Sequence, residues 1–212
     1  MDARGHSYPS TLDRVSLVGR TIDGQFLEGQ AVACHARMPL YRVHLRFRDE
    51  NPHAYPPAIQ AIKEADLIVL GPGSLFTSII PNLLVPGIVQ AIRASKGKVL
   101  FVCSLADSQG ETRGMSARQH LQALYDHGME GLVDYVLVHS DHRLSADGQQ
   151  DAKQTLATHA TQETLAAMDA DFIPSSVYVD YEDAVAMQKT GPMVLARYLR
   201  DPERPTWHDP LA

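Results

Sequence analysis

The sequence has little cysteine, no block of like charge and no long apolar run, and each shortage excludes a class of protein. Its two cysteines, Cys34 and Cys103, form no CxxC pair, which excludes a disulfide framework and a cysteine-based zinc site. The 19 basic and 25 acidic residues are spread along the chain, unlike the clustered Lys and Arg of proteins that bind nucleic acids or membrane surfaces. No stretch has the length of a transmembrane helix or the pattern of a signal peptide. These features predict a soluble protein of the cytoplasm.

The remaining composition is that of a folded domain. Apolar residues make up 44% of the sequence and charged residues 21%, which are ordinary shares for a globular protein and exclude wholesale disorder. A chain of 212 residues exceeds the usual domain length of about 150 residues and can bury a genuine core. We therefore expect residues 1–212 to form one domain.

The first part of the sequence predicts antiparallel strands. Residues 12–18 alternate weakly, and Asp23-Gly24 separates them from a second run, 25–33, as expected for a hairpin turn whose residues tolerate positive φ. Residues 41–47 alternate strictly between apolar and polar side chains, which predicts a half-buried strand. The side chains expected to face inward are Tyr41, Val43, Leu45 and Phe47.

From residue 56 the pattern changes to alternating helices and apolar strands. Helical periodicity follows Pro56-Pro57 and Pro86, and a third helix opens at a capping box in residues 116–119. This order predicts an α/β fold: a doubly wound, Rossmann-like, mostly parallel sheet with an N-terminal antiparallel hairpin. Nearer the C-terminus we expect a strand at 177–179 and a helix at 192–199. The three runs that predict strands covered on both faces are 66–70, 98–105 and 135–138.

The most informative stretch is a loop rich in glycine and hydroxyl side chains, residues 71–78, which leaves the first of these strands. Open α/β sheets place ligands at this end of their strands, and glycines let backbone N–H groups approach a ligand. Ser74, Thr77 and Ser78 add hydroxyl donors, a combination suited to a phosphate. The loop is neither a Walker A loop, because it has no lysine, nor a dinucleotide fingerprint, because Phe76 holds the third glycine position. A plain strand-to-helix turn is the alternative.

A second polar loop, residues 104–112, follows the next strand and should open onto the same crevice. Asp107 and Glu111 are the candidate catalytic residues, since either carboxylate could act as a base, hold a metal ion or orient a ribose hydroxyl. Gly110 would permit a sharp turn. A polar loop that only leads into the capped helix is the alternative.

Other candidates for chemistry are weaker. His120 and His127 would lie about 10 Å apart along a helix, which is too far for one metal ion. Ser74 does not stand in a GxSxG elbow, which disfavours a serine hydrolase. Cys103 lies within an apolar run, and we expect it to be a core residue and not a nucleophile.

Across these loops the sequence resembles the CofD/YvcK-like family, which holds 2-phospho-L-lactate transferases and gluconeogenesis-factor regulators. The resemblance rests mainly on ADLIVLGPGSLFTSIIPNLLVPGIVQAI (residues 65–92), with QGET (109–112) and ARQHLQAL (117–124). TIDGQFLEGQ (21–30) resembles the hairpin that precedes this string in the family. A motif near the family's end is matched by His208-Asp209-Pro210. The resemblance spans most of the chain and is weakest over 140–190.

The long string is closer to the gluconeogenesis-factor branch, which implies a cytoplasmic protein that binds a UDP-sugar and is linked to cell shape and envelope synthesis. The transferase branch implies instead an enzyme that joins a phospholactyl group, supplied as a guanosine diphosphate conjugate, to a deazaflavin with magnesium. By resemblance, Asn82 would help hold the 71–78 loop, and Glu111 with Thr112 would border the crevice. The ligand-binding candidates are Gly71, Pro72, Gly73, Ser74, Thr77, Ser78, Asn82, Gly110, Glu111 and Thr112.

The sequence also departs from the family pattern. Members begin with a strand and a GGGTG turn, followed by an acidic DDGGSSG-type segment, and neither occurs here. Ser104 and Gln109 stand where Asn and Pro are common. We therefore expect a member that is incomplete at its N-terminus and lacks the acidic residues that hold magnesium. A structural fragment that binds no ligand is the third alternative.

The expected loss of the first strands predicts self-association. It would leave a formerly central strand of the sheet as an exposed edge, and such edges pair with other chains. We therefore expect either a homo-oligomer, most simply a dimer, or a chain of marginal stability, as measured by analytical ultracentrifugation and thermal unfolding. A monomer with a sharp melting transition would contradict this prediction.

Overall fold

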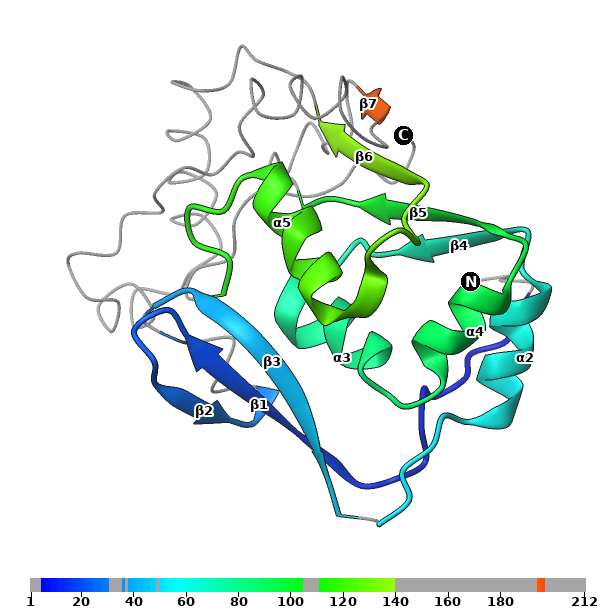
Figure 1. Cartoon of the computed structure of the whole chain (residues 1–212), viewed down its shortest axis with the longest axis horizontal. Helices are drawn as coiled ribbons and strands as arrows, with labels where there is room; N and C mark the ends of the chain where they lie inside the picture. The colour runs from blue at the N-terminus through cyan, green and yellow to red at the C-terminus, as the bar shows by residue number, and fades with distance from the viewer. Residues whose placement is uncertain are drawn as a thin grey trace, which may run out of the picture.

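A computed structural model describes residues 5–30, 36, 38–48, 50–104, 111–139 and 194–196. Two sheets organise this part of the chain, an antiparallel sheet in the order β2-β1-β3 and a parallel sheet in the order β4-β5-β6-β7. Figure 1 shows the antiparallel sheet beside the helices that pack on the parallel sheet, with β3 nearest to them. The predicted α/β class, with an antiparallel extension at its N-terminal side, is therefore confirmed.

The antiparallel sheet is built on the predicted hairpin. Its first two strands are joined by a turn in which Gly24 adopts a φ of +88°, a conformation that glycine tolerates. The Thr21 hydroxyl oxygen accepts a hydrogen bond from the Gln25 N–H at 3.0 Å, which closes the turn. The strands are β1 (Val15–Thr21), β2 (Phe26–Glu28) and β3 (Leu40–Phe47).

A bulge in β3 changes which side chains face inward. Arg20 lies opposite Arg42 and Thr21 lies opposite Leu40, so Tyr41 has no partner on β1. One extra residue reverses the alternation of the strand. Leu40 and Val43 are therefore both buried, whereas Tyr41 is 57% exposed. The inward prediction is wrong for Tyr41.

The parallel sheet alternates with short helices, as the sequence predicts. The capping box is present: the Ser116 hydroxyl accepts from the Gln119 N–H, and the Gln119 side chain accepts from the Ser116 N–H. The strands are β4 (Leu67–Leu70), β5 (Lys98–Val102), β6 (Tyr135–His139) and β7 (Val194–Ala196). The α-helices are α2 (Pro56–Glu64), α3 (Ile80–Leu83), α4 (Ile88–Ala94) and α5 (Ala117–Leu124). Two wider helical turns are η1 (Leu75–Ile79) and η2 (Tyr125–Met129).

The predicted helix at 192–199 is wrong over its described residues. These residues form β7, which runs parallel to β6 with Val194 opposite Leu137 and Ala196 opposite His139. A short apolar segment fits a helix or a strand equally well by its periodicity, and here pairing with β6 favours the strand. The strand expected at 177–179 lies outside the described residues.

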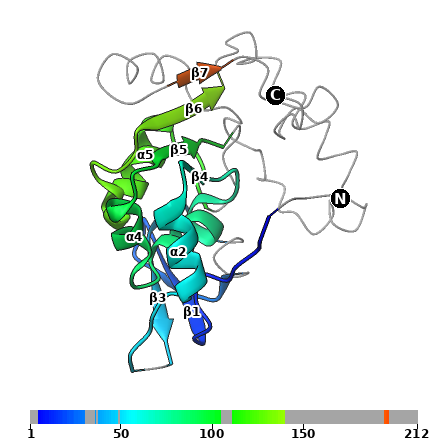
Figure 2. The same cartoon turned by 90° about the vertical axis from the view of Figure 1, so that its right-hand side faces the viewer.

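One face of β4 is more open than the sequence predicts. Ile68 and Leu70 face the core beneath the helices, and Figure 2 shows α4 and α5 gathered on one side of the strands. Leu67 and Val69 point the other way and are 51% and 48% exposed. The expectation that residues 66–70 are covered on both faces is therefore wrong for the described part of the chain.

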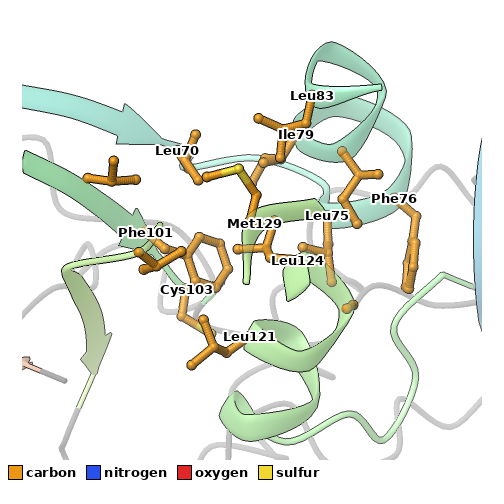
Figure 3. Packing of buried hydrophobic residues seen from close by; sticks show 14 of the residues in the cluster. Leu70, Leu75, Phe76, Ile79, Leu83, Phe101, Cys103, Leu121, Leu124 and Met129 are labelled. Atoms are coloured by element: carbon orange, nitrogen blue, oxygen red, sulfur yellow. The ribbon is translucent and has the colours of Figure 1, made fainter. Parts of the chain in front are cut away.

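The core lies between the parallel sheet and the helical turns that follow its strands. Figure 3 shows Leu70 and Phe101, from β4 and β5, facing Leu124 and Met129. Cys103 is 1% exposed, and burial raises the pKa of its thiol to about 12, which confirms it as a core residue. Burying side chains of this size stabilises a fold by about 1.5–3 kcal/mol each. This packing holds the ends of β4 and β5 against η1.

No single helix in the described ranges is long and apolar enough to cross a membrane. The segments Leu75–Leu83 and Ile88–Ala94 reach the required length and composition only together, and they meet at a 70° bend.

Gly97 lets the turn before β5 pass close to the end of α2. A Cβ at this position would lie 2.2 Å from the carbonyl oxygen of Ala65, so no side chain fits without backbone movement. The approach is held by the next residue, because the Lys98 N–H donates to the Asp66 carbonyl oxygen at 3.0 Å.

We expect Gly97→Ala to lower the free energy of unfolding by about 2 kcal/mol, the usual cost of overfilling a tight site. Urea unfolding measures this change. Gly5→Ala is the control, since a Cβ there meets nothing within 4 Å. Equal stability of the two variants would contradict the close approach at Gly97.

Candidate anion-binding site

The loop of residues 71–78, called here the GPGS loop, lies at the carboxyl end of β4 and crosses the end of β5. Gly71 adopts a φ of +94°, and a Cβ there would lie 3.0 Å from the carbonyl oxygen of Val102. Glycine is therefore required for this crossing. The loop occupies the edge of the sheet at which α/β proteins bind ligands.

The second half of the GPGS loop coils into η1. The N–H groups of Ser78 and Ile79 both donate to the Ser74 carbonyl oxygen, at 3.0 and 2.9 Å, and the turn continues into α3. The first N–H groups of such a turn have no partner within the helix and attract negative charge.

The carboxylate of Glu111 fills that position from inside the protein. Its Oε1 accepts hydrogen bonds from the N–H groups of Phe76 at 2.6 Å and Thr77 at 3.0 Å. Its Oε2 accepts a third from the Thr77 hydroxyl at 3.1 Å. Glu111 is 1% exposed, and burial raises its pKa although these hydrogen bonds oppose the shift. The protein thus supplies its own anion to the beginning of η1.

This arrangement divides the GPGS loop into two halves. Thr77 is buried and directed at Glu111, whereas Gly73 and Ser78 are exposed and Ser74 is half-buried. Within the described part of the chain, the N–H groups of Gly73 and Ser74 donate no hydrogen bond. An external anion would therefore meet these two N–H groups and the neighbouring hydroxyls.

Side chains from distant segments brace the loop. Asn82 donates from Nδ2 to the Ser78 carbonyl oxygen at 2.6 Å, and its Oδ1 accepts from the Ser10 hydroxyl. Gln30 donates from Nε2 to the Thr77 carbonyl oxygen at 2.9 Å. Sequence reasoning named Asn82 through the family resemblance but missed Ser10 and Gln30. The signal for Gln30 was its place at the end of the family-like hairpin string.

The second loop is described at Ser104, Glu111 and Thr112. The carboxylate of Glu111, a candidate base, metal ligand or partner of a ribose hydroxyl, is enclosed and accepts hydrogen bonds on both oxygens. Thr112 beside it is buried. Asp107 and Gly110 lie outside the described residues. Among the residues that are described, no three His, Cys, Asp or Glu side chains gather as they would around a metal ion.

Glu111→Gln should change how stability depends on pH. Because burial raises the pKa of Glu111, the stabilisation associated with its protonated form is present below the unfolded value, near 4.5, and is lost as pH rises through the folded pKa. Glutamine keeps an acceptor oxygen without charge, so the variant should not lose stability over this range. Urea unfolding of both proteins from pH 4.5 to 8 measures the difference.

Glu111→Ala is the matched variant, because it removes the acceptor of three hydrogen bonds. We expect it to lower the free energy of unfolding by about 3 kcal/mol, given the usual contribution of hydrogen bonds to a charged group. Parallel pH profiles for the wild type and Glu111→Gln, together with a stable Glu111→Ala, would contradict the assigned role.

Comparison with known sequences places the chain in a family. It matches the family model described as 2-phospho-L-lactate transferase CofD over residues 1–177. It is 40% identical over 141 residues to the gluconeogenesis factor of Halalkalibacterium halodurans, covering 66% of this chain and 43% of that protein. It is 35% identical over 201 residues to a putative gluconeogenesis factor of a Nostoc species, covering 92% and 42%. The chain thus spans less than half the length of these curated relatives.

The fold agrees with solved structures. A crystal structure of a UPF0052 family member from Bacillus halodurans matches 98% of this chain and 60% of its own with a TM-score of 0.76 at 29% identity. A second crystal structure from the same organism gives a TM-score of 0.71 at 30% identity, over 93% of this chain and 56% of that one. Sequence and fold lead to the same conclusion: the chain belongs to the CofD family, and its relatives include proteins named gluconeogenesis factor.

Proposed function

We propose that this chain binds a nucleotide-sugar, specifically a UDP-sugar, at the GPGS loop and acts as a cytoplasmic regulator of the gluconeogenesis-factor type, linked to cell shape and envelope synthesis. The observation that carries the proposal is the pair of N–H groups of Gly73 and Ser74 at the carboxyl end of β4, which donate no hydrogen bond to the residues that the structure describes. The relatives named gluconeogenesis factor support the regulatory role.

The charge around the loop favours this class of ligand. The GPGS loop contains no Lys or Arg, and the Glu111 carboxylate lies directly behind it. A terminal phosphate carries nearly two negative charges near neutral pH, whereas each phosphate of a nucleotide-sugar is esterified and carries one. The loop offers the N–H groups of Gly73 and Ser74 and the hydroxyls of Ser74 and Ser78. These groups suit the less charged ligand, because they would hold it by hydrogen bonds and not by ion pairs.

A transferase acting on a phospholactyl donor and a deazaflavin is the second candidate, favoured by the description of the matching family model. That reaction would use magnesium. Glu111 does not fit as a magnesium ligand, because its carboxylate is buried and accepts hydrogen bonds on both oxygens.

Thermal-shift titrations with UDP-N-acetylglucosamine, GDP and NAD, each with and without magnesium, test the proposal. We expect stabilisation by the UDP-sugar alone, independent of magnesium, of about 2.7 kcal/mol at 100 times Kd. Replacing Ser74 and Ser78 together by alanine should weaken binding about tenfold, since each hydrogen bond contributes about 0.5–1.5 kcal/mol. Ser16→Ala, which removes a hydroxyl from β1, is the control and should bind as the wild type does.

Other results of the titrations would favour one of the two alternative functions. A shift with GDP that requires magnesium would favour the transferase. No shift with any of the three ligands would favour a fragment that binds none of them.

A further inference from the structure

His127 links η2 to the antiparallel sheet through β3. It lies in η2, where the chain leaves helical geometry at His127 and Gly128, and its side chain is buried. Its Nδ1 lies 2.6 Å from the carbonyl oxygen of Ala123, and its Nε2 lies 3.2 Å from the backbone nitrogen of Val43 on β3. The imidazole therefore bridges η2 and the antiparallel sheet.

Both partners of the ring are backbone groups of fixed polarity. The Ala123 carbonyl can only accept, so Nδ1 must carry a proton, and the Val43 N–H can only donate, so Nε2 must carry none. Only the neutral Nδ1–H tautomer satisfies both contacts. A proton on Nε2 would place two N–H groups against each other and remove the acceptor of Val43.

The bond to Val43 attaches the edge of β3 that faces away from β1. Within the described antiparallel sheet β3 pairs only with β1, so its outer edge needs partners elsewhere. The Leu40 N–H donates to the Glu111 carbonyl oxygen at 3.0 Å, and the Arg42 guanidinium donates to the Asp126 carbonyl oxygen at 3.4 Å.

We propose that His127 is a pH-sensitive joint: uptake of a proton at Nε2 breaks its hydrogen bond to Val43 and releases the middle of the outer edge of β3 from η2. The groups packed around the ring oppose its protonation on balance. Burial lowers the pKa of His127 most strongly, and the Arg42 guanidinium on β3 lowers it further. The hydrogen bond to the Ala123 carbonyl and the charge of Asp126 on η2 act in the opposite direction. From η1 the edge of Phe76, which carries no charge, packs against the ring.

The direction of the pH effect follows from the lowered pKa. The stability contributed by the joint is present above the unfolded value of 6.5 and is lost as pH falls through the folded pKa. The amides of β3 should then exchange faster with solvent, with Val43 affected most.

Amide hydrogen exchange of the full chain, corrected for the intrinsic pH dependence of exchange, tests the joint. In the wild type, protection of Val43 should fall about fivefold between pH 7.5 and 5, which corresponds to the usual net contribution of one hydrogen bond. His127→Gln retains an acceptor for the Val43 N–H but does not titrate. In this variant the protection of the Val43 amide should therefore stay constant between pH 7.5 and 5. His120→Gln is the matched control, because His120 is also buried and titratable but its Nδ1 contacts the Ser116 carbonyl within its own helix. It should behave as the wild type does.

Three results would overturn the proposal. The first is an unchanged pH dependence of β3 protection in His127→Gln, and the second is a loss of that dependence in His120→Gln. The third needs no variant: long-range ¹H–¹⁵N correlation of the wild type at pH 7.5 should show His127 as the Nδ1–H tautomer, and a proton on Nε2 would exclude the joint.

Discussion

The buried carboxylate of Glu111 is the constraint around which this structure is arranged. Removing an ionised group from water is costly unless hydrogen bonds replace the lost hydration. Glu111 obtains them from Phe76 and Thr77 at the beginning of η1, while its own carbonyl oxygen accepts from Leu40 on β3. One residue therefore fixes the GPGS loop, the helical turn after it and the antiparallel sheet relative to one another.

The same constraint limits what the GPGS loop can bind. The N–H groups of Phe76 and Thr77 cannot serve a ligand without leaving a buried charge unsatisfied, so the loop offers only its exposed half, around Gly73 and Ser74. The Walker A type of phosphate loop also carries a lysine, which the GPGS loop lacks. With a carboxylate in that place, the loop suits a ligand held by a few neutral hydrogen bonds, which agrees with the proposed nucleotide-sugar.

Local patterns in the sequence predicted most helices, strands and turns, whereas contacts between distant residues determined the orientation of Tyr41, the strand β7 and the partners of Glu111. The Asp23-Gly24 turn, the capping box at Ser116 and the position of the GPGS loop follow from residues close together in the chain. The outward turn of Tyr41 depends on the register with β1, and β7 exists because residues 194–196 meet β6. Composition marked Glu111 as chemically interesting, yet only the fold shows it facing Phe76, 35 positions earlier in the chain.

Two contacts hold the outer edge of β3, one between Leu40 and Glu111 and one between Val43 and His127, and they respond to acid in different ways. Glu111 holds Leu40 through a backbone carbonyl, which does not titrate, and protonation of its side chain leaves oxygen acceptors in place. His127 holds Val43 through a ring nitrogen that is an acceptor only while it is unprotonated. With the proposed release at His127, the sheet would stay attached at Leu40, beside the GPGS loop, and loosen three residues further along β3. Glu111 would therefore hold both the GPGS loop and the end of β3 that stays attached during such a movement.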